Sequence, residues 1–189
     1  MWIFVPRNGE LVLTWFRFSG VAASAVFWIF TLISINLNPW FDFYRDAFSD
    51  LGGSRANNPW IYNAGLVVSS IFIELLSIHM ISSSRSKLGV VAGSYFSIAG
   101  IFLAMIAIFP SGTRPHVFIS TWFFIQAFLG AFLYGAAMFR EDRSLSIAVF
   151  ATFVIALAGS IARWPSAASL EAFEIVLLTF FAVLYALRG

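Results

Sequence analysis

Six long apolar stretches constrain the fold of this chain more than any other feature of its sequence. They cover residues 14–35, 61–81, 88–109, 117–139, 145–162 and 168–187. Each is close to the roughly 20 residues that an α-helix needs to cross the hydrocarbon core of a bilayer. A helix also satisfies its backbone hydrogen bonds within one segment, as a membrane requires. The sequence therefore predicts an all-α integral membrane protein, with a six-helix transmembrane bundle forming one domain over residues 1–189.

Composition excludes the main soluble classes of protein. Hydrophobic residues make up 60% of the chain and charged residues 11%, whereas soluble domains average about 45–50% and about 25%. The net charge of +2 is too small to indicate a nucleic-acid partner. The chain has no cysteine, which excludes disulfides and thiolate metal sites. Membrane lipids are the expected partners.

The basic residues predict an orientation in the cell membrane. Short connections force consecutive spans to be antiparallel neighbours, so the Lys and Arg residues fall into two sets. One side collects seven, Arg7, Arg17, Arg85, Lys87, Arg140, Arg143 and Arg188; the other collects four, Arg45, Arg55, Arg114 and Arg163. Because cytoplasmic loops carry the excess of Lys and Arg, we expect a multi-pass protein with both termini in the cytoplasm and the first, third and fifth loops outside.

Small residues at four-residue spacing predict how the helices pack. The third stretch carries Gly89, Gly93 and Ser97, and the fourth carries Ala127, Ala131 and Gly135. Such residues allow the close backbone approach that holds membrane helices together. Phe is also abundant, with 23 copies. We interpret most of these rings as lipid-facing or gap-filling bulk, with an aromatic-lined quinone or isoprenoid groove as the alternative.

The first outer loop has its own helical pattern. Apolar residues recur there every three or four positions: Trp40, Phe43, Tyr44, Ala47, Phe48 and Leu51. Asn38 can cap the start of such a helix. The pattern predicts an amphipathic helix over about residues 39–51, lying on the outer surface of the membrane. Asp42, Asp46 and Asp50 repel one another on its polar face, which indicates either a solvated surface or a ligand site.

Short motifs suggest a family. Ser49-Asp50-Leu51-Gly52 lies in the first outer loop, and Asn63-Ala64-Gly65 begins the second span. Pro110 ends the third span, and His116 precedes the fourth. Together these residues resemble the prokaryotic membrane family called domain of unknown function 998, over nearly the whole chain. The resemblance implies a six-helix membrane bundle and no assigned activity, and it draws attention to Ser49, Asp50, Asn63 and His116.

These observations give one leading hypothesis for function. We expect a polar site on the outer face that binds a lipid headgroup or a small polar or anionic ligand, because Arg side chains recognise phosphate and carboxylate. Asp50, Arg114 and His116 are expected at its centre. The full set of candidate ligand-binding residues is Asp42, Asp46, Ser49, Asp50, Asn63, Arg114, His116 and Arg163.

Polar residues inside the spans support a second hypothesis, a small transporter or channel. Glu74 lies within the second span, and acids at such depth are functional candidates by default. Arg17 and His79 are its candidate partners, and a hydrogen bond from a neighbouring Ser or Tyr to Glu74 is the alternative. Glu171 and Glu174 open the sixth span. We interpret both as acids at a helix N-terminus that pair with Arg163.

Catalysis is the third hypothesis, and it has the weakest support. Asp50 and His116 supply an acid and a base for an enzyme acting on lipid or isoprenoid phosphates. Ser49 would complete a triad, but no nucleophile motif surrounds it. His79 and His116 are expected to lie most of a membrane thickness apart, which argues against a bis-His haem or a two-His zinc site. No metal or other cofactor is therefore assigned.

Overall fold

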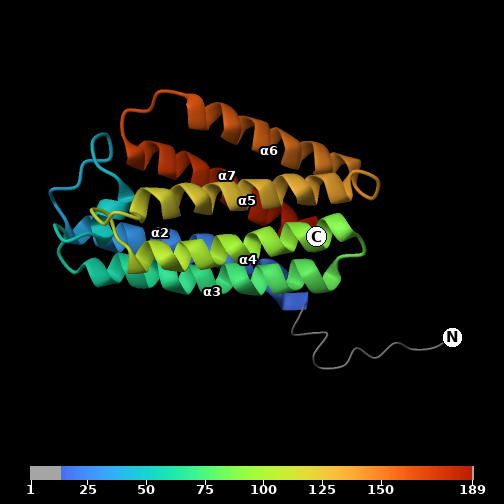
Figure 1. Cartoon of the computed structure of the whole chain (residues 1–189), viewed down its shortest axis with the longest axis horizontal. Helices are drawn as coiled ribbons and strands as arrows, with labels where there is room; N and C mark the ends of the chain where they lie inside the picture. Colours follow the sequence, from blue (N-terminus) through green and yellow to red (C-terminus); the bar gives the residue numbers. More distant parts are fainter. Residues whose placement is uncertain (1–13, 189) are drawn as a thin grey trace.

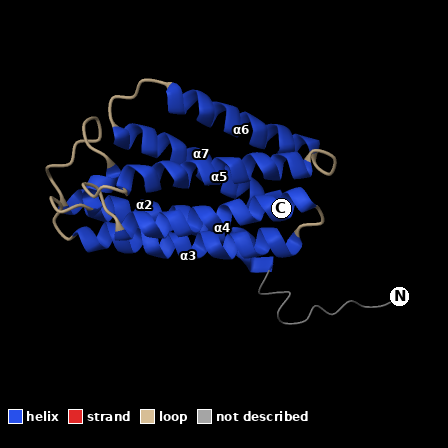
Figure 2. Cartoon of the chain, viewed as in Figure 1, coloured by secondary structure: helices blue, strands red, loops and turns tan. Residues whose placement is uncertain are grey.

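The computed structural model describes residues 14–188 and contains six long helices that run along one common axis (Figure 1). A short 3-10 helix, η1 (Phe16–Phe18), leads into α2 (Ser19–Leu37). The others are α3 (Pro59–Ser83), α4 (Lys87–Ile108), α5 (His116–Met138), α6 (Arg143–Ile161) and α7 (Ala167–Arg188). Within the described residues there is no strand (Figure 2).

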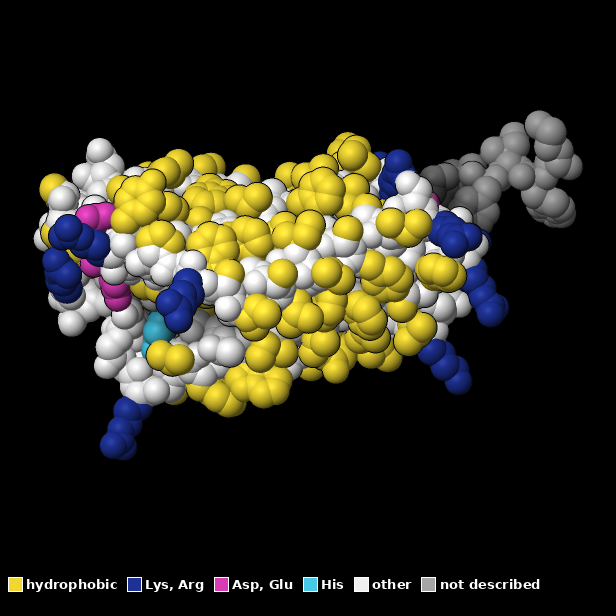
Figure 3. All heavy atoms as spheres, turned by 90° about the horizontal axis from the view of Figure 1, so that it is seen from above, with side chains coloured by type: hydrophobic (Ala, Val, Ile, Leu, Met, Phe, Trp, Pro, Cys, Tyr) yellow, Lys and Arg dark blue, Asp and Glu magenta, His cyan; other side chains and the backbone are white. Residues whose placement is uncertain are grey.

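All six helices are long and apolar enough to span a membrane, and they confirm the predicted multi-pass architecture. Their bounds differ from the six apolar stretches by at most two residues. The surface agrees with this assignment: apolar side chains cover the sides of the bundle, and charged side chains gather at its two ends (Figure 3).

Consecutive helices are antiparallel neighbours, and α7 returns to pack against α2. The helix α6 packs against α5 and α7 and leans away from the others (Figure 1). The connections 38–58, 109–115 and 162–166 lie together at what we call the first-loop end. The opposite end carries the connections 84–86 and 139–142 together with Arg188, and we call it the basic end.

The small-residue stripe of α4 faces α3, as the spacing predicts. Ser77 Oγ donates to the Gly93 carbonyl at 2.9 Å. A Cβ atom added at Gly93 would lie 2.7 Å from Ile81 Cγ1, too close for a real contact. In the next pair, Ser146 Oγ of α6 donates to the Gly135 carbonyl of α5 at 2.7 Å. Small residues thus let both helix pairs approach closely.

The prediction of an amphipathic helix over residues 39–51 is wrong. Turns at residues 39–40 and 43–45 alternate with irregular backbone, and a 3-10 helix, η2 (Phe48–Gly52), follows. The backbone is drawn instead toward the start of α7: Ser166 Oγ donates to the Phe43 carbonyl at 2.7 Å, and the Ala168 N–H donates to the Asp46 carbonyl at 3.0 Å. Asp42 Oδ1 also accepts from the Tyr44 N–H at 2.9 Å, a local bond that competes with helix formation.

Asn38 does not cap a helix start but joins the two ends of this loop. Its Nδ2 donates to the carbonyls of Ser34 at 2.8 Å and Asn57 at 3.2 Å. Its Oδ1 accepts from the Asn57 N–H at 2.6 Å and from Trp40 Nε1 at 3.0 Å. The side chain is 1% exposed, so Asn38 is a buried clamp that closes residues 38–57 into a compact loop.

Candidate functional site

A partly open cavity of about 100 Å³ extends from the first-loop end toward the middle of the bundle. Five helices line it, α2, α3, α4, α5 and α7, and η2 closes it at the first-loop end. The lining is mostly apolar, and seven of its side chains are aromatic: Phe27, Phe48, Tyr62, Phe96, Phe123, Phe124 and Phe181. This is the largely apolar concave space that is typical of small-molecule sites.

Three polar side chains face the cavity near η2. Glu171, in the first turns of α7, accepts from the Phe48 N–H at 2.7 Å through Oε2. Ser49 and Tyr62 also line the cavity, and within residues 14–188 neither hydroxyl forms a hydrogen bond. A ligand in the cavity would therefore meet two hydroxyl groups without a partner among the described residues and one carboxyl group at this end. The other lining hydroxyls, of Ser24, Ser69 and Ser120, already donate to backbone carbonyls.

Phe48 anchors η2, which covers the cavity at the first-loop end. Its side chain is 2% exposed. Its ring stacks on Phe41 at a centroid distance of 5.9 Å and meets Trp28 and Phe27 edge-on at 5.9 and 6.2 Å. Aromatic pairs in this range add about 0.5–1.5 kcal/mol each beyond the area that they bury. The cover is consequently a packed part of the fold.

The Ser-Asp-Leu-Gly residues tie η2 to its neighbours. Asp50 Oδ2 accepts from the Ala47 N–H at 2.9 Å, and Oδ1 accepts from Ser111 Oγ at 2.6 Å. Asn63 Nδ2 donates to the Gly52 carbonyl at 3.1 Å. A Cβ atom at Gly52 would collide with the Asn63 side chain, so a glycine is needed for this approach. The fold thus brings Ser49, Asp50 and Asn63 together. Ser49 is part of the cover of the cavity, and Asp50 and Asn63 hold this cover in place through hydrogen bonds.

The predicted centre of Asp50, Arg114 and His116 forms only in part. Asp50 reaches the loop that contains Arg114, but its partner there is Ser111. His116 Nδ1 is hydrogen-bonded to the Phe109 carbonyl at 2.8 Å, and its side chain is 7% exposed. Arg114 is exposed and, in the described part of the chain, forms no ion pair. His116 therefore joins the two ends of the connection between α4 and α5. Arg114 has no contact with Asp50 or His116 that would form a common site.

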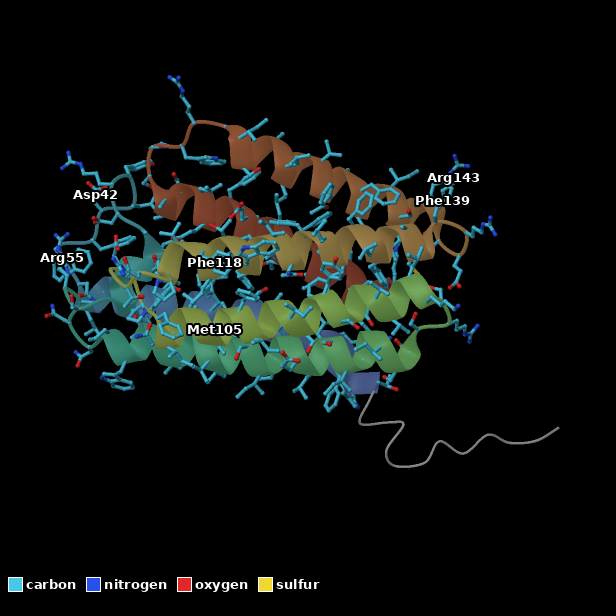
Figure 4. The ribbon with its side chains drawn as sticks, in the orientation of Figure 1. Asp42, Arg55, Met105, Phe118, Phe139 and Arg143 are labelled. Atoms are coloured by element: carbon cyan, nitrogen blue, oxygen red, sulfur yellow. The ribbon has the colours of Figure 1, made fainter. Side chains whose placement is uncertain are left out.

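The remaining outer charges pair locally. Arg45 Nε lies 3.4 Å from Asp42 Oδ2, and Arg55 Nη1 lies 3.9 Å from Asp46 Oδ1. The Arg55 guanidinium also stacks over the Trp40 ring at 4.2 Å. Figure 4 shows Asp42 and Arg55 at the same end of the bundle. Exposed ion pairs of this kind contribute about 0–1 kcal/mol to stability. Asp42 and Asp46 therefore belong to a network of surface ion pairs, and this network leaves neither carboxylate free for a ligand.

Glu74 has neither of its two predicted charged partners. Ser97 Oγ of α4 donates to Glu74 Oε2 at 2.8 Å, which is the neighbouring-serine alternative. Glu74 Oε1 is enclosed and, among the described residues, has no hydrogen-bond partner. His79 Nδ1 is hydrogen-bonded to the Tyr185 hydroxyl at 2.6 Å, and the Arg17 guanidinium lies 4.7 Å from the Phe18 ring centre. Residues 14–188 thus contain no hydrogen-bonded chain from Asp50 through Glu74 to Arg17.

Glu171 is the site residue that the sequence reasoning misassigned. The predicted partner, Arg163, is exposed and forms no ion pair with any described residue. The carboxylate instead holds the backbone of Phe48, 123 residues earlier in the chain. One signal was present: Glu171, Ile175, Leu178 and Ala182 have helical spacing and share the face that lines the cavity. An acid on an otherwise apolar inward face is the intramembrane acid that merits a functional hypothesis.

Comparison with known proteins adds one match. A family model described as "Protein of unknown function (DUF998)" matches residues 21–188, which cover all of the helices from α3 to α7 and nearly all of α2. No curated protein and no solved structure matches the chain.

Proposed function

Since the chain belongs to the DUF998 family, whose function is unknown, we propose a role from the site itself: the protein binds an amphipathic membrane lipid in the cavity beneath η2. The observation that carries this proposal is the combination of an aromatic-lined cavity with Ser49, Tyr62 and Glu171 gathered at one end. Membrane lipids are the molecules of this chemistry that surround the bundle.

The cavity favours a chain-like apolar group. Its volume of about 100 Å³ is about two-thirds of the roughly 150 Å³ apolar cavity that binds benzene in another protein. A short part of an acyl or isoprenoid chain would fit. The six Phe rings that line the cavity favour the aromatic-lined groove, whereas the exposed Phe rings agree with lipid-facing bulk.

The polar end favours an uncharged head over an anionic one, because no Lys, Arg or His side chain of the described residues lines the cavity. The Glu171 carboxyl group can exchange hydrogen bonds with a polar head but supplies no positive charge to attract an anion. Ser49 and Tyr62 each donate or accept one hydrogen bond. A hydroxyl or carbonyl group would match this set. The anionic-ligand version of the site depends on Arg114 and Arg163, and neither residue lines the cavity.

We also propose that the first-loop end faces the outside of the cell membrane. The basic end carries Arg85, Lys87, Arg140, Arg143 and Arg188, which the positive-inside rule assigns to the cytoplasm; Arg7 lies outside the described residues. A reporter that works only outside the membrane, fused after Gly189, should give no signal. A strong signal would reverse the orientation.

Two alanines on α2 provide a matched test of lipid binding. Ala23 lines the cavity, whereas Ala25, on the same helix, is exposed on the side of the bundle. We expect native mass spectrometry of the purified protein to detect a copurified lipid on the parent protein and on Ala25→Phe. On Ala23→Phe the lipid should be lost, because the new ring occupies its place. Equal occupancy of the two variants would refute the proposal.

Glu171→Gln tests the polar end separately. A glutamine can still accept from the Phe48 N–H, so η2 should stay in place while the carboxylate is lost. We expect the copurified lipid to change in amount or headgroup class, whereas Glu174→Gln, which does not line the cavity, should leave the inventory unchanged. An inventory that neither substitution alters would show that Glu171 does not contact the ligand.

A further inference from the structure

A second pocket, with a volume of about 160 Å³, lies at the basic end. It is separate from the aromatic cavity, with which it shares no lining residue. The end of α3 and the loop after it, the start of α4 and the ends of α5 and α7 surround it. Its polar lining residues include Ser83, Ser84, Arg85, Tyr134, Glu141 and Arg188.

Tyr134 supplies an unused donor in this pocket. Its side chain is 6% exposed, and within residues 14–188 its hydroxyl forms no hydrogen bond. The neighbouring Tyr185 is already bonded to His79, and its ring meets that of Tyr134 edge-on at 5.1 Å. The Tyr134 hydroxyl is not among the enclosed polar atoms of the described residues, so it is accessible from the pocket and can donate to a ligand there.

The charge of the pocket indicates the kind of acceptor. Two guanidinium groups, Arg85 and Arg188, and one carboxylate, Glu141, line it. Arg85 is exposed and has no ion pair in the described part of the chain. Arg188 makes a single contact, Nη1 to Asp142 Oδ2 at 3.4 Å, with its side chain 50% exposed. Most guanidinium N–H groups in the pocket are consequently free to bind an anion.

We propose that this pocket binds a phosphate group, held by Arg85 and Arg188 and by a hydrogen bond from the Tyr134 hydroxyl. Arginine binds phosphate oxygens through paired N–H groups. The pocket lies between the ends of membrane helices, the level at which basic pockets meet lipid headgroups. The phosphodiester of an anionic phospholipid is thus the source that the position favours, and soluble phosphate is the other. The inference does not depend on a ligand in the aromatic cavity.

The test compares two double substitutions of equal charge at opposite ends of the bundle. Purified full-length protein in neutral detergent is titrated with phosphatidylglycerol, diacylglycerol or inorganic phosphate, and binding is followed by thermal unfolding and native mass spectrometry. Arg85→Gln/Arg188→Gln should bind phosphatidylglycerol about 10- to 100-fold more weakly, the range expected for lost hydrogen bonds to a charged group. Arg114→Gln/Arg163→Gln should bind as the parent protein does.

The three ligands distinguish the sources. Diacylglycerol has the same chains without the phosphate, so any binding of it in the aromatic cavity should be unchanged in Arg85→Gln/Arg188→Gln, and it should not displace phosphatidylglycerol from the pocket at the basic end. Saturable stabilisation by inorganic phosphate alone, lost in Arg85→Gln/Arg188→Gln, would support a phosphate site and overturn the lipid source. Equal weakening of both double variants would overturn the proposal, because attraction would then be nonspecific. Binding of diacylglycerol that weakens in Arg85→Gln/Arg188→Gln as much as binding of phosphatidylglycerol does would also overturn it, because the pocket would then not recognise the phosphate.

Two further variants separate binding from folding. Asp142→Asn removes the ion pair with Arg188 but keeps a residue that can cap α6, where Asp142 Oδ1 accepts from the Leu145 N–H at 2.9 Å. It should bind phosphatidylglycerol at least as tightly as the parent. Tyr134→Phe removes only the hydroxyl and should weaken binding about tenfold. Unchanged binding in Tyr134→Phe, or loss of binding in Asp142→Asn, would contradict the geometry.

Discussion

Asp50 offers the sharpest test of how η2 is held over the cavity. Its carboxylate accepts from the Ala47 N–H at 2.9 Å and from Ser111 Oγ at 2.6 Å. A hydrogen bond to a charged group contributes about 1.5–3 kcal/mol, and partial exposure of Asp50 places each bond near the lower end of that range. We therefore expect Asp50→Ala to lower the free energy of unfolding by about 2–4 kcal/mol.

A pair of double-mutant cycles identifies the partner. Ser111→Ala should cost about 1.5 kcal/mol, and the double variant with Asp50→Ala should cost less than the sum of the singles by about 1–1.5 kcal/mol, as expected for residues in contact. Arg114→Ala, three residues further along the same loop, should change stability by less than about 0.5 kcal/mol, because its side chain is exposed and forms no ion pair with any residue from 14 to 188. Its effect should simply add to that of Asp50→Ala.

The measurement is denaturant unfolding of purified protein in one detergent, followed by circular dichroism. Proteolysis of the loop gives a second readout, since loss of the Ser111 bond should increase cleavage between residues 39 and 57. Coupling of Asp50 to Arg114 as large as its coupling to Ser111 would refute this account. It would mean that an ion pair between Asp50 and Arg114, which the structure does not contain, holds the first outer loop in place.

Three further substitutions test the packing and the clamp. Gly93→Leu should lower the midpoint of thermal unfolding much more than Phe109→Leu, because overpacking costs about 1–3 kcal/mol, and the opposite ranking would mean that the packing face of α4 is misassigned. Asn38→Ala should cost about 3 kcal/mol, from several lost hydrogen bonds, and should speed amide exchange in residues 39–57; unchanged exchange would contradict its role as a clamp. Gly100→Ala should lower the free energy of unfolding, because the new Cβ would lie 2.5 Å from Glu74 Oε1. In the double variant, Glu74→Ala should restore much of the lost stability, and strictly additive effects would exclude a contact between the two residues.

The six spans could be predicted because the bilayer fixes what a spanning helix must be. Every stretch had to be about 20 residues long and almost free of charge, and the short links left one arrangement of neighbours. The Gly93 stripe followed from the same physics, since membrane helices approach closely at small residues. Local sequence was sufficient for these features.

The first outer loop could not be predicted in this way. Its aromatic spacing fits a surface helix, but Phe48 packs on the bundle and its backbone binds Glu171, 123 residues away. No local pattern reveals such a partner. Asp50 had an obvious charged partner in Arg114, yet the nearby Ser111 is the residue that its carboxylate reaches. Long-range geometry decides which of several suitable polar groups meet.

The bond between Phe48 and Glu171 also has a consequence for the order of synthesis. Glu171 belongs to the last helix, so it leaves the ribosome 123 residues after the segment that it holds. At the usual 5–20 residues per second, that delay is about 6–25 s. During this time α2 to α5 can insert and begin to enclose the cavity, while η2 still lacks its acceptor on α7. The cavity of the nascent bundle is therefore open to surrounding lipid until α7 inserts.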